Sequence, residues 1–307
     1  MSKEVKIKIF DKFSKDLTVT LLKFNLSFID DNGLKIDLQD HYICPLSLRA
    51  YSRKDIDKLS IEHVPQHSLN GKPLILTDKE FNNNDGGTKD KKILNYFRYR
   101  NFQDGVGPID AKFYVPDIIN GALSGKLYSG QVKDGKAEVK FGFPNKTVNM
   151  LKERGLIENW SGVKLRFKVD YSPEINKSAL LKAAYLIAFS KIGYRLLFNS
   201  QGIKSNSYGL IIKELEEKAV CEDFPLIFTE TLGMNMPDNI GIVENETFKL
   251  LVIKVCYNLA GKEYIYHIIL PHPDDQNLNH MIDFKNIYVK QEQMMKVRNL
   301  NVDYLLD

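Results

Sequence analysis

Several short stretches of the chain alternate between apolar and polar residues, and each such stretch predicts a half-buried strand. Residues 131–139 alternate on both sides of an Asp-Gly pair, which predicts a β-hairpin. Val163–Val169 alternates again, with one apolar face. Phe248–Tyr257 and Glu263–Leu270 predict two adjacent strands joined by a turn at residues 259–262.

Other segments show different patterns. Near the N-terminus, Leu17–Phe28 and Leu34–Leu38 predict two strands around an Asp-Asp-Asn-Gly turn. Ser178–Phe198 is apolar on most sides and predicts a buried helix, and Leu210–Ala219 predicts a further one. Strands followed by helices in this mixture indicate an α+β protein.

Residues 41–104 differ from their surroundings. They are rich in Asn, Asp, Gly, Lys and Pro and hold three of the six histidines, so they are poor material for a hydrophobic core. Such a segment predicts a functional site built on loops. Gly and Pro then cluster at residues 105–110, and we place a domain boundary there. We therefore expect one domain at residues 1–105 and an α+β domain at residues 106–307, built around the buried helix.

Composition narrows the class of protein. Hydrophobic residues make up 43% and charged residues 27%, which are ordinary globular values. The net charge of +4 permits an anionic partner without requiring one. The three cysteines stand far apart and the N-terminus is charged, so we expect a cytoplasmic protein without disulfides or a signal peptide. The most apolar segment contains charged residues, and we expect no membrane span.

Glu62, His63 and Asn82 are the residues that point most clearly to chemistry. Carboxylate and amide oxygens are hard ligands that suit Mg²⁺ or Mn²⁺. A neutral histidine beside such an ion can take a proton from water, and the ion can hold a phosphate. We therefore predict Glu62 and Asn82 as metal ligands and His63 as the catalytic base of phosphodiester hydrolysis. Asp90 is a candidate third ligand or a group behind the ligands; otherwise it is a solvated helix charge.

These residues stand in a pattern that resembles the HNH endonucleases of the His-Me finger type. That family typically reads CPLC, then EHVPPxSLGGKP, then LTCKKCNN. Here Cys44–Ser47 reads CPLS, Glu62–Pro73 reads EHVPQHSLNGKP, and Leu76–Asn83 reads LTDKEFNN. Lys177–Leu186, followed by Phe189 and Gly193-Tyr194, resembles the C-terminal helix of such proteins. The resemblance implies a ββα-metal nuclease module within residues 1–105.

One departure from the family concerns zinc. The family's four cysteines would hold a structural zinc ion, and the corresponding residues here are Cys44, Ser47, Asp78 and Phe81. One soft ligand cannot hold a tetrahedral Zn²⁺. We therefore expect no structural zinc, with packing around Phe81 in its place.

A basic segment follows the predicted site. Lys89, Lys91, Lys92, Arg98 and Arg100 are interleaved with aromatic residues on a predicted helix. They form either a solvated face beside an aromatic core stripe or a set of phosphate contacts, and one helix can provide both.

A second motif has a different resemblance. Pro271–Asp275 reads PHPDD after an apolar strand, like the zinc motif of the LmbE-type deacetylases, but little chain follows it, so we interpret it as a turn that ends a strand.

The function predicted from the sequence is metal-dependent cleavage of nucleic acid, with DNA favoured over RNA. The resemblance also suggests a bacterial restriction or anti-phage effector, with a partner ATPase or sensor or a second copy of the chain as possible partners. The alternative is a catalytically inactive HNH fold that binds nucleic acid or assembles a complex.

Overall fold

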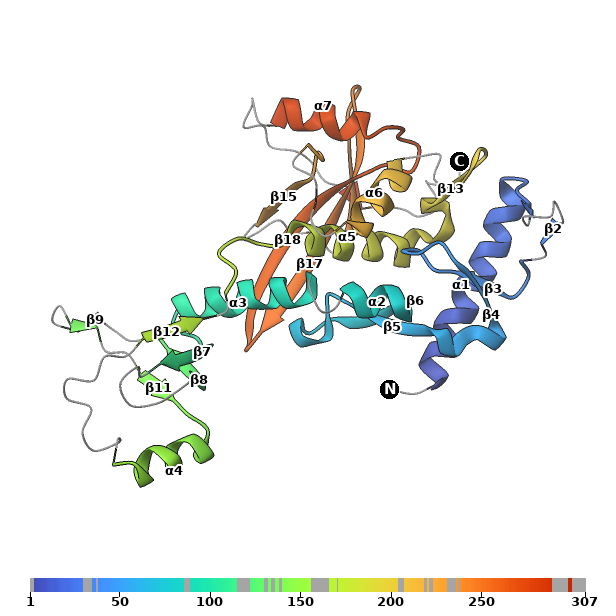
Figure 1. Ribbon diagram of the computed structural model, residues 1–307. Helices are drawn as coiled ribbons and strands as arrows, with labels where there is room; N and C mark the ends of the chain where they lie inside the picture. The colour runs from blue at the N-terminus through green and yellow to red at the C-terminus, as the bar shows by residue number, and fades with distance from the viewer. Residues whose placement is uncertain are drawn as a thin grey trace. The chain divides into compact units, whose positions relative to one another are not determined.

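The fold is that of a computed structural model, which describes residues 3–29, 35–36, 38–85, 89–114, 122–129, 132–133, 136–137, 140–155, 166–169, 171–203, 207–217, 220, 223–230, 236, 238–288 and 298–299. The chain is an α+β protein with helices and antiparallel sheets (Figure 1). It divides into two compact units. The first contains residues 1–90, 176–258 and 263–307, and the second contains residues 91–175 and 259–262.

This division differs from the predicted boundary at residue 105. The second unit is an insertion between two parts of the first, because the segments on either side of it share one core. In that core Phe13 stacks on Phe189 with ring centroids 5.0 Å apart, and the Tyr194 hydroxyl donates to the Ile43 carbonyl over 2.7 Å.

The N-terminal part of the first unit is built on a long helix, α1 (Lys3–Lys23). We had predicted a strand from Leu17 onward, and that prediction is wrong. The residues that α1 buries include Phe10, Phe13, Leu17 and Thr20, and this spacing of three to four residues is helical. The β-branched residues at positions 18–20 had favoured a strand locally, but packing of the helical face outweighs that preference.

Short strands and one hairpin follow α1. The described elements up to the insertion are β1 (Phe28–Ile29), β2 (Lys35–Ile36), β3 (His41–Ile43), β4 (Ala50–Ser52), η1 (Arg53–Lys58), β5 (Leu59–Val64), η2 (His67–Leu69), β6 (Lys72–Asp78) and α2 (Lys79–Asp85). Strands β1 and β2, β3 and β4, and β5 and β6 each pair antiparallel. The turn predicted between β1 and β2 falls outside the described residues.

The C-terminal part of the first unit surrounds a buried helix, α5 (Lys177–Ile192). Asn176 caps its start by accepting a hydrogen bond from the Ala179 amide over 2.8 Å. The buried helix predicted from the sequence is thus confirmed, although it ends at Ile192 and continues as the short η4 (Gly193–Leu196).

A five-stranded sheet completes this unit, in the order β15-β18-β17-β16-β19. Helix α7 packs on one face of it, and its Met281 and Phe284 join the same core as Leu250 and Val252 of β17 (Figure 1). The hairpin predicted at residues 248–270 is confirmed as β17 and β18. The elements are β13 (Phe198–Asn199), β14 (Gly202–Ile203), α6 (Ser207–Glu216), β15 (Ile227–Glu230), β16 (Ile240–Glu244), β17 (Lys249–Leu259), β18 (Lys262–Pro271), α7 (Asn279–Tyr288) and β19 (Arg298–Asn299).

The second unit contains a four-stranded antiparallel sheet in the order β11-β8-β7-β12. Its inner face packs against Leu151 of helix α4. The predicted Asp-Gly hairpin is present as β9 and β10, with its turn outside the described residues. The elements are α3 (Lys91–Gln103), β7 (Ile109–Tyr114), β8 (Ala122–Tyr128), β9 (Val132–Lys133), β10 (Lys136–Ala137), β11 (Lys140–Gly142), α4 (Asn145–Glu153) and β12 (Arg166–Val169).

Candidate functional site

The residues that point to chemistry lie on one hairpin and the helix that follows it. Strand β5 pairs antiparallel with β6, and α2 begins directly after β6. The register shifts where Glu62 pairs with Ile75 and His63 pairs with Pro73, so Leu74 is an extra residue on β6. Such a bulge bends and twists a hairpin. Glu62 and His63 therefore lie at this bulge, near the C-terminal end of β5, and Asn82 lies on α2.

The loop between β5 and β6 has a backbone conformation that depends on Asn70 and Gly71. A Cβ atom added at Gly71 would lie 1.3 Å from the Pro65 carbonyl oxygen, so only glycine fits there. Asn70 adopts a left-handed conformation with φ of 65°. The amides of Leu69 and Gly71 both donate to the Gln66 carbonyl, over 2.9 and 3.2 Å. The Asn-Gly pair in the SLNGKP segment thus closes a tight loop against the end of β5.

This loop places a second histidine next to His63. The imidazole rings of His63 and His67 are perpendicular, with centroids 5.1 Å apart. Burial lowers the pKa of His63 below its ordinary value, and the nearby charge of His67 lowers it further. The ring of His63 is half-buried and neutral at pH 7, which is the form that accepts a proton.

The Glu62 carboxylate is buried and has a cationic partner. Its Oε1 atom lies 2.9 Å from Nζ of Lys182 on α5, and the two side chains are 8% and 5% exposed. Its Oε2 atom accepts a long hydrogen bond of 3.5 Å from the Thr77 hydroxyl. Both carboxylate oxygens therefore have protein partners, and a metal ion would have to displace the Lys182 ammonium to bind Glu62 through Oε1.

Sequence reasoning missed Lys182 as a site residue, because it counted only as a charge within an apolar helix. The sequence did contain a signal. A lysine in a helix that is buried on nearly all sides needs an anionic partner in the core. The sequence could not identify that partner as Glu62, which is far away along the chain.

Asn82 is linked to the same hairpin by hydroxyl groups. Its Nδ2 atom donates to the Ser60 hydroxyl over 3.2 Å. That hydroxyl lies 3.4 Å from the Thr77 hydroxyl, which in turn donates to Glu62. A chain of polar contacts thus connects α2 with the buried carboxylate. Because Nδ2 is used here, the amide oxygen is the Asn82 atom suited to bind a ligand.

Cys44, Ser47, Asp78 and Phe81, the four residues considered above for a structural zinc, are linked by hydrogen bonds. The buried Cys44 sulfur accepts hydrogen bonds from the amides of Asp78 over 3.3 Å and Ser47 over 3.5 Å. The Asp78 carboxylate accepts from the Phe81 amide over 3.2 Å, which caps the start of α2. Tyr51 and Arg49 donate to the other Asp78 oxygen. Hydrogen bonds therefore connect the positions that a zinc ion would join.

The environment of this corner changes the ionisation of its groups. Burial raises the pKa of the Cys44 thiol, so the sulfur is a neutral acceptor. Burial alone would also raise the pKa of Asp78. The hydrogen bonds from Tyr51, Phe81 and Glu80 and the charge of Arg49 outweigh that effect and lower the pKa of Asp78 below its ordinary value. Asp78 is thus a stable anion.

The third predicted ligand, Asp90, lies beside the loop of the hairpin. Its backbone carbonyl accepts a hydrogen bond of 2.8 Å from the Gln66 side chain, and its own side chain is half-buried.

The structure corrects the prediction made for the preceding residue, Lys89. Lys89, expected to contact phosphate, is 3% exposed and donates its ammonium to the Leu215 carbonyl. The buried ammonium of Lys89 is thus directed at a backbone carbonyl and not at solvent.

The other four basic residues lie on α3, in the second unit. Ile93, Phe97 and Asn101 form the buried face of this helix, so that of its aromatic residues 96, 97 and 99 only Phe97 is buried and the other two are half-buried. Arg98 pairs with Asp110 over 3.4 Å, and the Arg100 guanidinium lies 5.8 Å from the centre of the Tyr96 ring. The remaining basic residues, Lys91 and Lys92, are exposed. That these residues contact phosphate stays a prediction.

The PHPDD segment ends a strand, as predicted. Strand β18 stops at Pro271, and the Asp275 amide donates to the His272 carbonyl over 2.9 Å to close a turn. The turn is packed under α6, because the Ser207 hydroxyl donates to the Asp275 carbonyl over 2.9 Å. His272 and Asp275 are only 2% and 3% exposed.

Comparison with known proteins gives no match, whether to family models, to curated proteins or to solved structures. Within the part of the chain that the structure describes, no helix is long and apolar enough to cross a bilayer. The described residues also contain no group of three or more His, Cys, Asp and Glu side chains placed to hold a metal ion.

Proposed function

We propose that the segment from β3 to Asp90 is a His-Me finger module that hydrolyses phosphodiester bonds in nucleic acid with the help of Mg²⁺ or Mn²⁺. One observation carries the proposal. The hairpin β5–β6 and helix α2 together hold a neutral, half-buried His63 and an Asn82 whose amide oxygen suits a ligand. The corner formed by Cys44 and Asp78 lies at the start of this helix, where the family resemblance places its zinc.

In this proposal His63 acts as the general base. Its lowered pKa keeps the imidazole neutral at pH 7, so it can accept a proton from a water molecule that attacks phosphorus. The neighbouring ring of His67 fixes one side of the imidazole. A bound divalent ion would stabilise charge on the phosphate and the leaving oxygen.

The ligand set fits such an ion only in part. The Asn82 amide oxygen suits it, whereas Glu62 is already neutralised by Lys182. Metal binding through the Oε1 atom of Glu62 therefore requires release of the Lys182 ammonium.

Cleavage assays on single-stranded, double-stranded and branched nucleic acid test the proposal directly. Cleavage should require Mg²⁺ or Mn²⁺ and stop when a chelator is added. The His63→Ala variant should cleave roughly 10²–10⁴-fold more slowly than the wild type. His41→Ala is the matched control, because the ring of this histidine hydrogen-bonds to the nearby Gln39 carbonyl and has no role in the proposed reaction. Equal cleavage by the wild type and His63→Ala would refute the assignment of the base.

A second function is favoured by a specific observation, the buried ion pair between Glu62 and Lys182. If the lysine permanently occupies the position of a metal ion, the module binds nucleic acid without cutting it. This alternative predicts salt-sensitive binding and no cleavage with any divalent ion. The same assays distinguish the two functions.

A further inference from the structure

The positive charge of the chain is concentrated in the second unit. Residues 91–175 and 259–262 contain 16 Lys and Arg against 9 Asp and Glu, a net charge of +7. The first unit contains 27 against 30, a net charge of −3. The modest overall charge of +4 is therefore the sum of a basic second unit and a slightly acidic first unit. Such a charge distribution favours a polyanionic partner for the insertion.

The sheet of this unit has one apolar and one polar face. Strand β7 alternates strictly, so that Ile109, Ala111 and Phe113 are buried against α4. The residues between them, Asp110 and Lys112, are exposed on the opposite face. A sheet with one face in the core and one open to solvent can bind a ligand along the open face.

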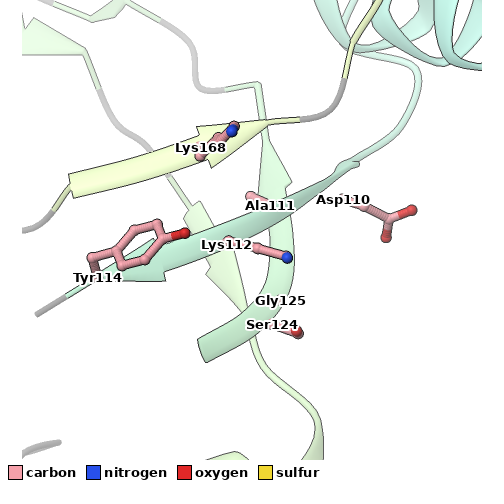
Figure 2. A pocket seen from close by; sticks show the side chains of 7 residues that line it. All are labelled: Asp110, Ala111, Lys112, Tyr114, Ser124, Gly125 and Lys168. Carbon is pink, nitrogen blue, oxygen red and sulfur yellow. The ribbon is translucent and has the colours of Figure 1, made fainter. Parts of the chain in front are cut away.

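The open face is hollowed. A cavity of about 540 Å³ lies over β7 and its two neighbouring strands, and Figure 2 shows the residues that line it. Tyr114, Lys112 and Asp110 follow one another along β7, with Lys168 on β12 and Ser124 on β8. In the register, Lys112 lies directly opposite Ser124 on one side and Lys168 on the other. The cavity therefore has two ammonium groups and a hydroxyl in one row across three strands.

The pairing of two lysines is unfavourable by itself. Like charges directly opposite each other on neighbouring strands repel and destabilise a sheet. An anion bound between Lys112 and Lys168 would relieve that repulsion. Asp110, the one carboxylate among the described residues that line the cavity, does not serve this purpose, because Lys126 and Arg98 already pair with it. The local charge therefore remains positive.

We propose that this face of the sheet binds a single-stranded segment of nucleic acid. Lys112 and Lys168 contact phosphates, Ser124 donates to a phosphate oxygen, and the half-buried Tyr114 stacks on an unpaired base. A base is available for stacking only where it is unpaired, which favours a single strand over a duplex. The inference rests on the proposed function, since it names the surface that holds the nucleic acid.

Binding of a labelled single-stranded oligonucleotide, measured by fluorescence anisotropy at several salt concentrations, tests the cationic row. A chelator is present throughout, so that no cleavage is needed. Each lost phosphate contact should reduce the slope of log affinity against log salt by about 0.7 for a single strand. The Lys112→Gln/Lys168→Gln variant should therefore lose about 1.4.

The matched control is Lys146→Gln/Lys152→Gln. It removes the same charge from the same unit, but from exposed positions on α4, the helix that covers the opposite face of the sheet. The control should retain most of the wild-type slope. An equal reduction in both variants, or none in the first, would overturn the proposal. Circular dichroism spectra show whether both variants remain folded.

Tyr114→Leu tests the preference for a single strand. Loss of one stacked base should weaken single-strand binding by roughly 5- to 150-fold and leave duplex binding unchanged. An unchanged ratio of the two affinities would overturn the single-strand assignment. Competition by polyglutamate as effective as that by nucleic acid would overturn the choice of partner. If the variants change binding as expected but the protein cleaves no nucleic acid, only the proposed function is refuted. If the lysine variant binds and cleaves as the wild type does, only this inference is refuted.

Discussion

The buried ion pair between Glu62 and Lys182 offers the sharpest test of how this protein works. The Lys182→Met variant keeps most of the side-chain length and removes the charge, which leaves the Glu62 carboxylate buried without its cation. Both side chains are less than a tenth exposed, so solvent screens the pair weakly. Breaking a buried pair in this way typically lowers the free energy of unfolding by about 3–5 kcal/mol.

Two further variants isolate the charge from the packing. Lys182→Arg retains a cation and should be much less destabilised. The double variant Glu62→Gln/Lys182→Met removes both charges, and its stability should return close to that of the wild type or exceed it. Urea unfolding followed by circular dichroism gives the stabilities of the wild type, these variants and the single variant Glu62→Gln. The wild type, Glu62→Gln, Lys182→Met and the double variant form the double-mutant cycle that gives the coupling energy. A loss below about 1 kcal/mol in Lys182→Met would refute the buried pair.

The same variants test Glu62 as a metal ligand. If the lysine takes the place of an ion, its removal should allow Mn²⁺ to bind the carboxylate. At an Mn²⁺ concentration of 100 times the dissociation constant, binding would restore about 2.7 kcal/mol of stability. Mn²⁺ should therefore stabilise Lys182→Met more than the wild type, and should have no effect on the double variant. Equal stabilisation of all three proteins would show that Glu62 is not a ligand.

Three other predictions follow from single residues. Because the pKa of His63 is lowered, the protein should still cleave as pH falls below about 6.5, the ordinary histidine pKa, and lose activity only at more acidic pH. A pH–rate profile that declines at or above that value would contradict this prediction. The folded-state pKa of Asp78 is depressed, so its contribution to stability is present above about 3.9 and is lost as pH falls through the folded-state value. Asp78→Asn removes the charge that accepts from Tyr51 and Arg49, so it should cost about 1–2 kcal/mol in urea unfolding at neutral pH and less at acidic pH; a cost independent of pH would refute the assignment. Cys44→Ser should cost about 1 kcal/mol, because the hydroxyl can accept the same amide hydrogen bonds, and elemental analysis should find no stoichiometric zinc; one zinc per chain, lost in this variant, would contradict it.

The sequence by itself determined the elements whose causes are local. The hairpins β9–β10 and β17–β18 were predicted from alternation and from a Gly-containing turn, and Gly261 has a φ of 80° that glycine adopts without strain. Helix α5 was predicted from a segment that is apolar on most sides. The motif that contains the Glu-His and Asn-Asn pairs also predicted two strands followed by a helix, which correspond to β5, β6 and α2.

The tertiary structure decided the features that depend on a distant partner. Residues 17–23 favour a strand locally, but they lie in α1 because a helical face packs against the core around Phe189. The second unit is an insertion because residues on both sides of it share that core. The residues next to Lys89 in the sequence do not indicate that its ammonium donates a hydrogen bond to the Leu215 carbonyl.

The candidate site shows the same division. His63, Glu62 and Asn82 could be selected from the sequence, because their chemistry is a property of each side chain. Whether the Glu62 carboxylate is available to a metal ion depends on which cation lies next to it, and the chain places Lys182 there from 120 residues away. Coulomb interactions and desolvation act through space, so a residue's charge state and accessibility are set by neighbours that only folding brings together.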